Sequence, residues 1–244
     1  MRILDGKNAI VTGASKGIGA AITEAFVAEG ANVWACVRNP ADFKMPGCSM
    51  GEGQWVKPIE LDLLDQRSIV DAVKAIRADK LPVDVLVNNA GIMDTALFQM
   101  ATADSLERQM QINFTGPFQL TQMVSKLMVR AKSGSIVNLT SCVALDPTAG
   151  KSAYAASKAA VIAATRSLAK ELGPFGVRAN CVAPSAVDTG MLEGTTEEAV
   201  DEVVAKTALG RIAKPEEIAS VVVFLASDLS SFVSAQTIRV DGGM

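Results

Sequence analysis

Apolar positions along the chain follow two alternating periods. Short runs rich in β-branched residues, such as residues 8–12 (NAIVT), have the length and composition of buried strands. In the longer stretches between them, apolar residues recur at helical spacing, as do Ile18, Ile22 and Phe26, which lie four positions apart. Because the two kinds of segment alternate along the chain, the pattern predicts a parallel sheet with helices on both faces.

The pattern predicts seven strands and five helices. The predicted strands are residues 8–12, 32–37, 55–61, 83–88, 135–140, 177–183 and 237–240. The predicted helices are residues 17–29, 68–78, 102–130, 152–172 and 215–226. We therefore expect an α/β fold, a Rossmann-type doubly wound parallel seven-stranded sheet. No repeat, low-complexity tract or linker divides the chain, so residues 1–244 are expected to form a single domain.

Two segments show neither the strand-like nor the helical pattern of apolar residues. Residues 38–54 are rich in Pro, Gly and Met, which predicts a surface excursion. Residues 185–207 follow the sixth predicted strand and are interpreted as a substrate loop. A mobile lid and a merely solvated loop both fit their composition.

Composition and charge exclude several classes of function. The net charge is −3, so nothing indicates a nucleic-acid or anionic-membrane partner. No apolar run approaches the roughly 18 residues of a membrane span, and the charged first seven residues lack the apolar core of a signal peptide. The four cysteines have no C-x-x-C spacing and are expected to be reduced thiols. These features predict a cytoplasmic protein.

Histidine is absent from the chain. Its absence excludes the Ser-His-Asp triad, the Cys-His dyad and the usual catalytic zinc site, and we expect no metal. In an enzyme of this composition the acid and base must be Tyr, Lys, Cys, Asp or Glu.

A glycine-rich loop follows the first predicted strand. It reads Thr12-Gly13-Ala14-Ser15-Lys16-Gly17-Ile18-Gly19, and a predicted helix begins within it. Glycines let a backbone approach a pyrophosphate closely, and a helix N-terminus offers N–H groups and a positive dipole end. The spacing is G-x-x-x-G-x-G. In this strand-turn-helix context it predicts a dinucleotide site, with a purely structural turn as the alternative.

The end of the second predicted strand bears on the choice of cofactor. An NAD site usually carries an acid there for the ribose 2′-hydroxyl, but this chain has Arg38. Together with Lys16, Arg38 favours a 2′-phosphate, so NADP(H) is preferred and NAD(H) remains possible; two ordinary surface cations are the alternative. Asp62 after the third predicted strand is either an adenine contact or a turn acid.

Four further positions are candidates for catalysis. Tyr154, the only tyrosine, and Lys158 lie four apart on a predicted helix and therefore face the same way. We expect the cation to lower the pKa of the phenol and make it usable near neutral pH. Ser141 ends the fifth predicted strand, where it is either a donor to a substrate carbonyl or a strand-end cap. Asn113 lies inside the long predicted helix, where an amide is unfavourable unless it orders a water or bends the helix.

These motifs resemble the short-chain dehydrogenase/reductase family over essentially the whole chain. The resemblance rests on residues 12–19, Asn88-Asn89-Ala90-Gly91, Asn113, Ser141, Tyr154 and Lys158, in order and spacing. Residues 177–184 (VRANCVAP) and 209–219 (LGRIAKPEEIA) look most like the bacterial 3-oxoacyl-[acyl-carrier-protein] reductase branch.

The resemblance implies a role for each of these residues. Tyr154 would protonate the carbonyl oxygen. Lys158 would lower the pKa of Tyr154 and hold the nicotinamide ribose. Ser141 would orient the carbonyl, and Asn113 would hold a water in a proton relay. Asn89 would line the adenosine side, and Thr189 and the Val187 backbone would hold the carboxamide. The full set of expected cofactor contacts is Gly13, Ser15, Lys16, Gly17, Ile18, Gly19, Arg38, Asp62, Leu63, Asn89, Ala90, Gly91, Tyr154, Lys158, Pro184, Val187 and Thr189. The family also implies a homotetramer with long-helix interfaces.

Two positions depart from the family pattern. Ser185 stands where the family usually has Gly, which puts the local backbone in doubt. Phe175 replaces the basic residue that carrier-protein-using members tend to have before Gly176, although Arg130 and Lys132 remain nearby in sequence. The second departure weakens the case for an acyl carrier protein as partner.

The expected function is NADPH-dependent reduction of a ketone such as a 3-oxoacyl thioester, by hydride transfer. The substrate is a small carbonyl or alcohol compound, with acyl carrier protein as a candidate partner. A dehydrogenase for a sugar, polyol or steroid-like alcohol is the first alternative. A non-catalytic dinucleotide-binding protein is the second, and the presence of both Tyr154 and Lys158 speaks against it.

Overall fold

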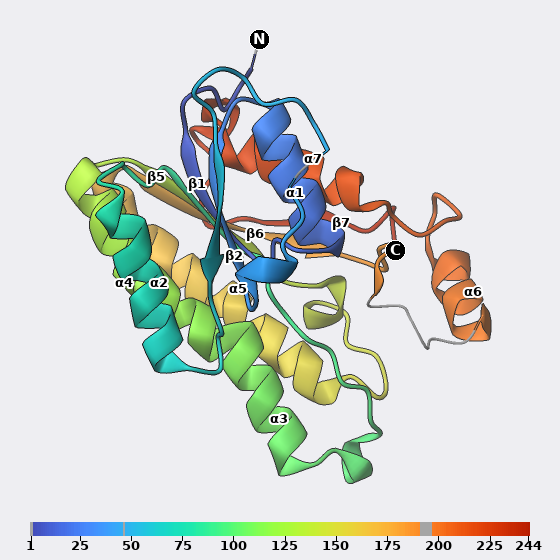
Figure 1. The fold of residues 1–244 in the computed structure, drawn as a ribbon. Coiled ribbons are helices and arrows are strands. Elements are labelled where there is room, and N and C mark those ends of the chain that lie inside the picture. Colours follow the sequence, from blue (N-terminus) through green and yellow to red (C-terminus); the bar gives the residue numbers. More distant parts are fainter. Residues whose placement is uncertain (1, 46, 191–196) are drawn as a thin grey trace.

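The computed structural model describes residues 2–45, 47–190 and 197–244 (Figure 1). In these residues a seven-stranded sheet has the order β3-β2-β1-β4-β5-β6-β7, and every neighbouring pair is parallel. The strands are β1 (Asn8–Thr12), β2 (Asn32–Val37), β3 (Val56–Glu60), β4 (Val85–Asn88), β5 (Gly134–Leu139), β6 (Val177–Pro184) and β7 (Thr237–Val240). The predicted fold class is confirmed, with strand ends that differ by at most two residues.

Helices cover both faces of this sheet. Figure 1 shows α1 and α7 on one face and α2, α4 and α5 on the other. The α-helices are α1 (Gly17–Ala28), α2 (Gln66–Ala78), α3 (Ala103–Met110), α4 (Gly116–Ala131), α5 (Ser152–Leu172), α6 (Glu197–Lys206) and α7 (Pro215–Ala226). Short 3-10 turns occupy Pro40–Asp42, Phe98–Met100, Cys142–Ala144, Gly173–Phe175 and Asp228–Ser230. Among the described residues, no helix is both long and apolar enough to cross a membrane.

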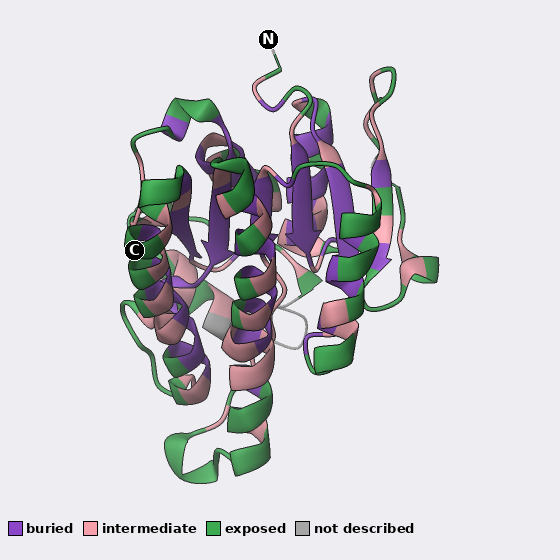
Figure 2. Ribbon diagram, turned by 90° about the vertical axis from the view of Figure 1, so that its left-hand side faces the viewer, coloured by how far each residue is buried: buried purple, intermediate pink, exposed green. Residues whose placement is uncertain are grey.

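The side-chain alternation of the strands divides the core into two layers. On β1, Ala9 and Val11 join the apolar layer beneath α1 and α7, whereas Ile10 joins the layer beneath α2 and α4. Every residue of β1 is buried, as expected for a central strand of a parallel sheet. Figure 2 shows the buried strands between helices whose outer faces are exposed.

The single long helix predicted at residues 102–130 is wrong in one respect. A π-helical turn, Gln111–Thr115, separates α3 from α4. Pro117 has no N–H to donate to the carbonyl of Asn113 four residues earlier, so the α-helical ladder is interrupted there. Instead Gly116 N donates to Gln111 O, five residues back, which inserts the extra residue of a π turn.

The irregular substrate loop predicted at residues 185–207 also needs correction. Its second half contains helix α6, while residues 191–196 lie outside the described part of the chain. Val200, Val203 and Val204 have spacings of three and four, which is a helical signal. Helix α6 has only 10 residues, too few for its apolar spacing to distinguish it from a loop.

The strand order places a crevice at the carboxyl edge of the sheet. The chain passes outward from β1 to β3 and then returns to the other side of β1 as β4. The loops after β1 and β4 therefore diverge, leaving the position where doubly wound sheets bind their ligands.

Candidate functional site

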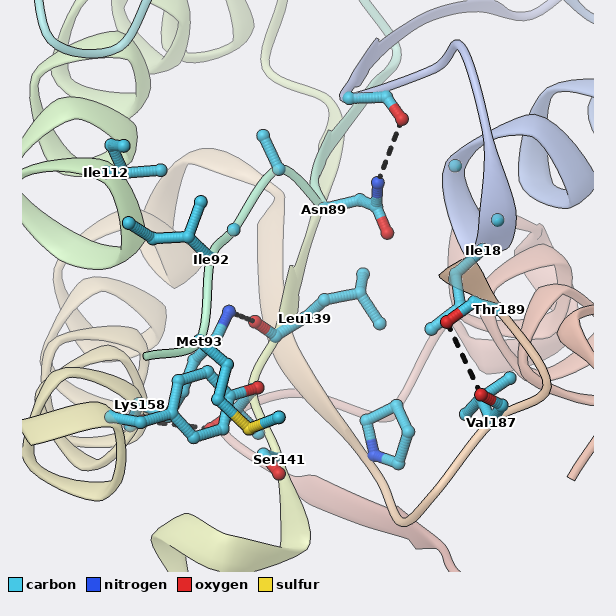
Figure 3. Close-up of a pocket in the computed structure, with 18 of the residues that line it drawn as sticks. Ile18, Asn89, Ile92, Met93, Ile112, Leu139, Ser141, Lys158, Val187 and Thr189 are labelled. Atoms are coloured by element: carbon cyan, nitrogen blue, oxygen red, sulfur yellow. Dashed lines mark hydrogen bonds between the residues drawn. The ribbon is translucent and has the colours of Figure 1, made fainter. Parts of the chain in front are cut away.

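A cavity of about 830 Å³ occupies this crevice (Figure 3). It is lined by all seventeen residues predicted to contact a cofactor, together with Ser141. The elements that contribute include the loop after β1 with the start of α1, the ends of β2 to β6, helices α3, α5 and α6, and the chain after β7. Of the predicted catalytic residues, Asn113 alone does not line this cavity.

The glycine loop after β1 packs so closely that it leaves no room for a side chain at position 19. Gly13 has a φ of +66°, and a Cβ on Gly19 would lie 2.1 Å from Gly13 O, so no larger residue fits at position 19. Asn89 Nδ2 donates to Thr12 O at 2.9 Å and to Gly13 O at 3.3 Å. Asn89 therefore supports the loop from the end of β4, a role that the sequence did not indicate.

The amino end of α1 faces the cavity. Lys16 at its N-cap position makes no side-chain capping bond to the described residues, and the first turn of α1 carries no acid. Main-chain N–H groups and the positive end of the helix dipole are thus presented at the cavity wall. This arrangement fits a dinucleotide pyrophosphate.

Charged residues line the neighbouring rim. The side chains of Lys16 and Arg38 are exposed there and border the cavity. Asp62 Oδ1 accepts from Leu64 N at 2.9 Å, so this carboxylate has the turn role that was one of its two predicted alternatives. Its contact with adenine remains a proposal.

Ser141 and Tyr154 meet at the other end of the cavity. Tyr154 lies in the first turn of α5 and is 7% exposed, and the Ser141 side chain lies beside its hydroxyl and acts to lower its pKa. Ser141 Oγ also accepts from Val143 N at 3.3 Å, which caps the 3-10 turn after β5. The capping role, one of the two predicted alternatives for Ser141, is therefore present, while its donation to a substrate carbonyl remains a proposal.

The phenol does not have the lowered pKa expected from the sequence. Burial raises the pKa of Tyr154 to about 12, against the opposing effect of the Ser141 hydrogen bond. Lys158 Nζ lies 6.0 Å from the centroid of the ring, and burial of the phenol outweighs the lowering that was expected from this cation. The phenol therefore keeps its proton across the neutral range, as a proton donor must.

Lys158 is itself almost fully buried. Its ammonium donates to Leu139 O at 2.9 Å, the bond drawn in Figure 3. Burial lowers the pKa of Lys158 to about 8. A Cβ on Gly91 would lie 3.2 Å from both Lys158 Nζ and Asn113 Oδ1, so the polar groups of these two residues converge on the same glycine.

Asn113 lies in the π turn between α3 and α4. Its side-chain amide donates to Ile92 O at 2.9 Å and to Ser157 Oγ at 3.0 Å, and it accepts from Ile92 N at 2.8 Å. Asn113 thus joins the bent helix to the segment after β4 and to α5. The sequence-based alternative of a helix bend agrees with this geometry, while the relay water remains a proposal.

The segment after β6 borders the cavity. Val187 makes a parallel bridge with Ala213, and Asp188 N donates to Ala213 O at 2.8 Å. Thr189 Oγ1 donates to Val187 O at 3.4 Å (Figure 3). Ser185 N donates to Val240 O at 3.2 Å, so the departure at Ser185 leaves it bonded to β7.

Several cavity residues were missed by sequence reasoning. They are apolar or small and include Ile92, Met93, Cys142, Val143, Val200, Val203 and Met244. Cys142 and Val143 directly follow Ser141 in sequence, so the prediction of Ser141 could have been extended to them. Met244 gave no local signal, because only the return of the chain after β7 brings it to the cavity. The described residues contain no group of three or more potential metal ligands.

Comparison with known proteins places this site in a family. A family model described as enoyl-(acyl carrier protein) reductase matches residues 13–244. The 3-oxoacyl-[acyl-carrier-protein] reductase FabG of Thermotoga maritima is 40% identical over 243 residues, 99% of this chain and 98% of that protein. FabG of Salmonella typhimurium is 36% identical over 240 residues, 98% of both chains.

Solved structures give the same result. A Brucella melitensis 3-oxoacyl-[acyl-carrier protein] reductase has a TM-score of 0.89 and 33% identity, covering 100% of this chain and 92% of that one. A Beutenbergia cavernae protein described as an NAD(P)-dependent gluconate 5-dehydrogenase, with bound NADP, has a TM-score of 0.90 and 33% identity, covering 98% and 97%. The chain belongs to the short-chain dehydrogenase/reductase family of oxidoreductases.

Proposed function

We propose that this enzyme reduces the ketone of a 3-oxoacyl thioester with NADPH. One observation carries the proposal: the hydroxyls of Ser141 and Tyr154 lie side by side in the cavity that the glycine loop also lines. Two O–H donors at one point suit a single oxygen atom that gains negative charge during the reaction. The names of the FabG relatives give the same substrate class.

The chain provides for each part of the cofactor. The glycine loop and the first turn of α1 would hold the pyrophosphate, and Arg38 with Lys16 would hold the 2′-phosphate. Lys158 would donate to the nicotinamide ribose, and the Val187 backbone with Thr189 would hold the carboxamide. Asp62, Leu63 and Asn89 would border the adenosine. Bound NADPH supplies the hydride.

The chain's own residues supply and control the proton. Tyr154 would transfer its phenolic proton to the carbonyl oxygen as the carbonyl carbon accepts the hydride, giving a secondary alcohol. Ser141 would donate a hydrogen bond to the same oxygen and orient the ketone. The Lys158 ammonium would stabilise the phenolate left behind, and Asn113 would hold a water that returns the proton.

Reduction of a carbonyl fits this site better than reduction of a carbon–carbon double bond. The matching family model is described in terms of an enoyl reductase, whereas the FabG relatives are named as ketone reductases. The paired hydroxyls of Ser141 and Tyr154 favour the ketone, because the oxygen that needs a proton lies on the carbon that receives the hydride.

Oxidation of a sugar-acid alcohol is a second candidate. It is favoured by two solved structures described as gluconate dehydrogenases, with TM-scores of 0.90 and 0.92. The same residues would act in reverse, with Tyr154 as the base.

A substrate panel tests both candidates. Purified enzyme is given NADPH with acetoacetyl thioesters and simple ketones, and NADP with gluconate and related polyols. We expect turnover of the thioester with NADPH, and Tyr154→Phe is the control for catalysis at this site. Turnover of gluconate alone would replace the proposal with the second candidate.

The carrier of the thioester is proposed to be acyl carrier protein. The main-chain O of Lys132 lies 2.5 Å from a Cβ placed on Gly176, so the Lys132 backbone packs next to the exposed Phe175. The Lys132 side chain is itself exposed, and this cation is the proposed substitute for the missing base. Equal kcat/KM for acetoacetyl groups on coenzyme A and on acyl carrier protein would contradict a role for the carrier.

We also propose a homotetramer and a cytoplasmic location. A second cavity of about 660 Å³ lies along α4 and α5, and Phe118 beside it is 45% exposed. The rings of Phe114 and Phe118 are 5.7 Å apart, so this face presents a joined aromatic surface to a second copy. All four cysteines are free thiols, as expected in a reducing compartment.

A further inference from the structure

Residues 241–244, which follow β7, turn back over the catalytic end of the cavity. Gly242 has a φ of +63°, and a Cβ there would lie 2.6 Å from Thr207 Cγ2. Leu209 N donates to Gly242 O at 3.1 Å. The turn is therefore packed against the residues that follow α6, and it brings Met244 to the cavity wall.

Met244 packs beside the catalytic tyrosine. The buried residues Cys142, Val143, Tyr154 and Ala155 form a small apolar cluster, against which both Met244 and Met93 pack. The two methionines also line the cavity. A ketone whose oxygen meets Tyr154 and Ser141 would thus place its substituent beside these thioether side chains.

Arg239 holds this arrangement with three different bonds. Its Nε donates to Asp241 and its Nη1 to Asp146, each at 2.5 Å, and its Nη2 donates to Met244 O at 2.9 Å. Asp146 N in turn donates to Cys142 O at 2.8 Å. One guanidinium therefore connects residues 241–244 to the segment that carries Ser141.

The geometry of these bonds makes Arg239 difficult to replace. A single exposed ion pair contributes little, because solvent screens it and the side chains must be ordered. Here the planar guanidinium uses three N–H groups in fixed directions toward three partners, which specifies position as well as attraction. Lysine carries the same charge without the fork.

We propose that Arg239 is a positioning residue that fixes Met244 as the wall for the apolar substituent of the substrate. On this basis the enzyme selects ketones with an unbranched apolar chain beside the carbonyl, and disfavours polyols. The choice of substrate rests on the proposed function, whereas the placement of Met244 does not.

The placement is tested by the reactivity of Cys142, which is 6% exposed and belongs to the cluster against which Met244 packs. In a Cys48→Ser background, N-ethylmaleimide modification of Cys142 is followed by mass spectrometry. Met244→Ala and Arg239→Gln are expected to raise its rate about 10-fold, because a covered thiol reacts through its open form. Lys57→Gln, which breaks the Lys57–Asp79 ion pair at the edge strand β3, is the matched control and should leave the rate unchanged.

Loss of the Arg239 charge cannot by itself account for faster modification of Cys142. The positive charge of Arg239 acts to lower the pKa of Cys142, so its loss alone would reduce the thiolate fraction and slow the reaction. Acceleration in Arg239→Gln would therefore report uncovering of the thiol. Unchanged or slower modification in both Arg239→Gln and Met244→Ala would overturn the proposed placement.

The specificity is tested with NADPH and thioesters of short and long 3-oxoacyl chains. We expect Met244→Ala and Arg239→Gln to reduce the preference for the long chain about 10-fold in kcat/KM, since a few methylene contacts are lost. The Kd for NADPH should stay unchanged, and Arg239→Lys should recover only part of the preference. An unchanged chain-length profile would overturn the specificity inference. If the wild type reduces no ketone, the proposed function fails and the specificity inference falls with it, while the Cys142 experiment still decides where Met244 lies.

Discussion

The protonation of Lys158 predicts how the rate of reduction depends on pH. Burial lowers its pKa to about 8, while burial raises the pKa of Tyr154 to about 12. As the pH rises through 8, the ammonium loses its proton before the phenol does. Reduction needs the ammonium to stabilise the developing phenolate, so the rate should be high below this pKa and fall above it.

The size of the fall follows from the pKa. With a pKa of about 8, roughly 90% of Lys158 is protonated at pH 7 and roughly 10% at pH 9. If only the protonated form supports proton transfer, kcat for ketone reduction at saturating NADPH should drop about 10-fold across this range. The assay is NADPH consumption as a function of pH, with substrate held at saturation.

Two variants test the assignment of this titration. Lys158→Arg keeps its charge throughout the range, so the fall should disappear at a lower overall rate. Lys151→Gln removes a different cation at the start of the same helix α5 and should retain the fall. A flat wild-type profile, or a fall that survives in Lys158→Arg, would show that the protonation of Lys158 does not control the rate.

Three further predictions concern cofactor and assembly. The wild type should prefer NADPH over NADH by about 10- to 100-fold in kcat/KM, and Arg38→Asp should reverse this preference, because one charge-assisted hydrogen bond is lost and an acceptor for the ribose hydroxyl is gained. If the ratio of kcat/KM for the two cofactors is unchanged in Arg38→Asp, Arg38 does not contact the 2′-phosphate. Gly19→Ala should abolish measurable NADPH binding in fluorescence titration, because its Cβ would collide with Gly13 O; retained affinity would mean that the loop can move away. Phe118→Glu should convert the proposed tetramer to smaller species in light scattering, because a carboxylate is costly to bury, and a wild-type monomer would contradict the assembly itself.

The sheet and the cofactor cradle were predictable because their signals are local. Each strand of a parallel sheet is a continuous apolar run, and β1 and β2 were predicted with their observed bounds. The glycine loop, Tyr154 and Lys158 depend on residues a few positions apart, and these positions line one cavity in the structure. Periodicity and spacing are sufficient for such features.

Other features depend on contacts between distant segments. The phenol's raised pKa comes from burial in the folded chain, which outweighs the local i,i+4 spacing with Lys158 that favoured a lowered value. The bond from Arg239 to Asp146 joins residues 93 positions apart, and neither residue belongs to a motif. The π turn had a local signal in Pro117, but the apolar periodicity on both sides concealed it.

Tyr154 is the proposed proton donor to the substrate oxygen, and the variant Tyr154→Phe isolates this step. The phenyl ring keeps the packing against Cys142 and Ala155 and removes only the hydroxyl that meets Ser141. The measurement is kcat for reduction of an acetoacetyl thioester, with the Kd for NADPH determined on the same preparation. We predict that kcat falls by about 10²- to 10⁴-fold while the Kd is unchanged. Turnover near the wild-type rate, with NADPH bound normally, would contradict the account.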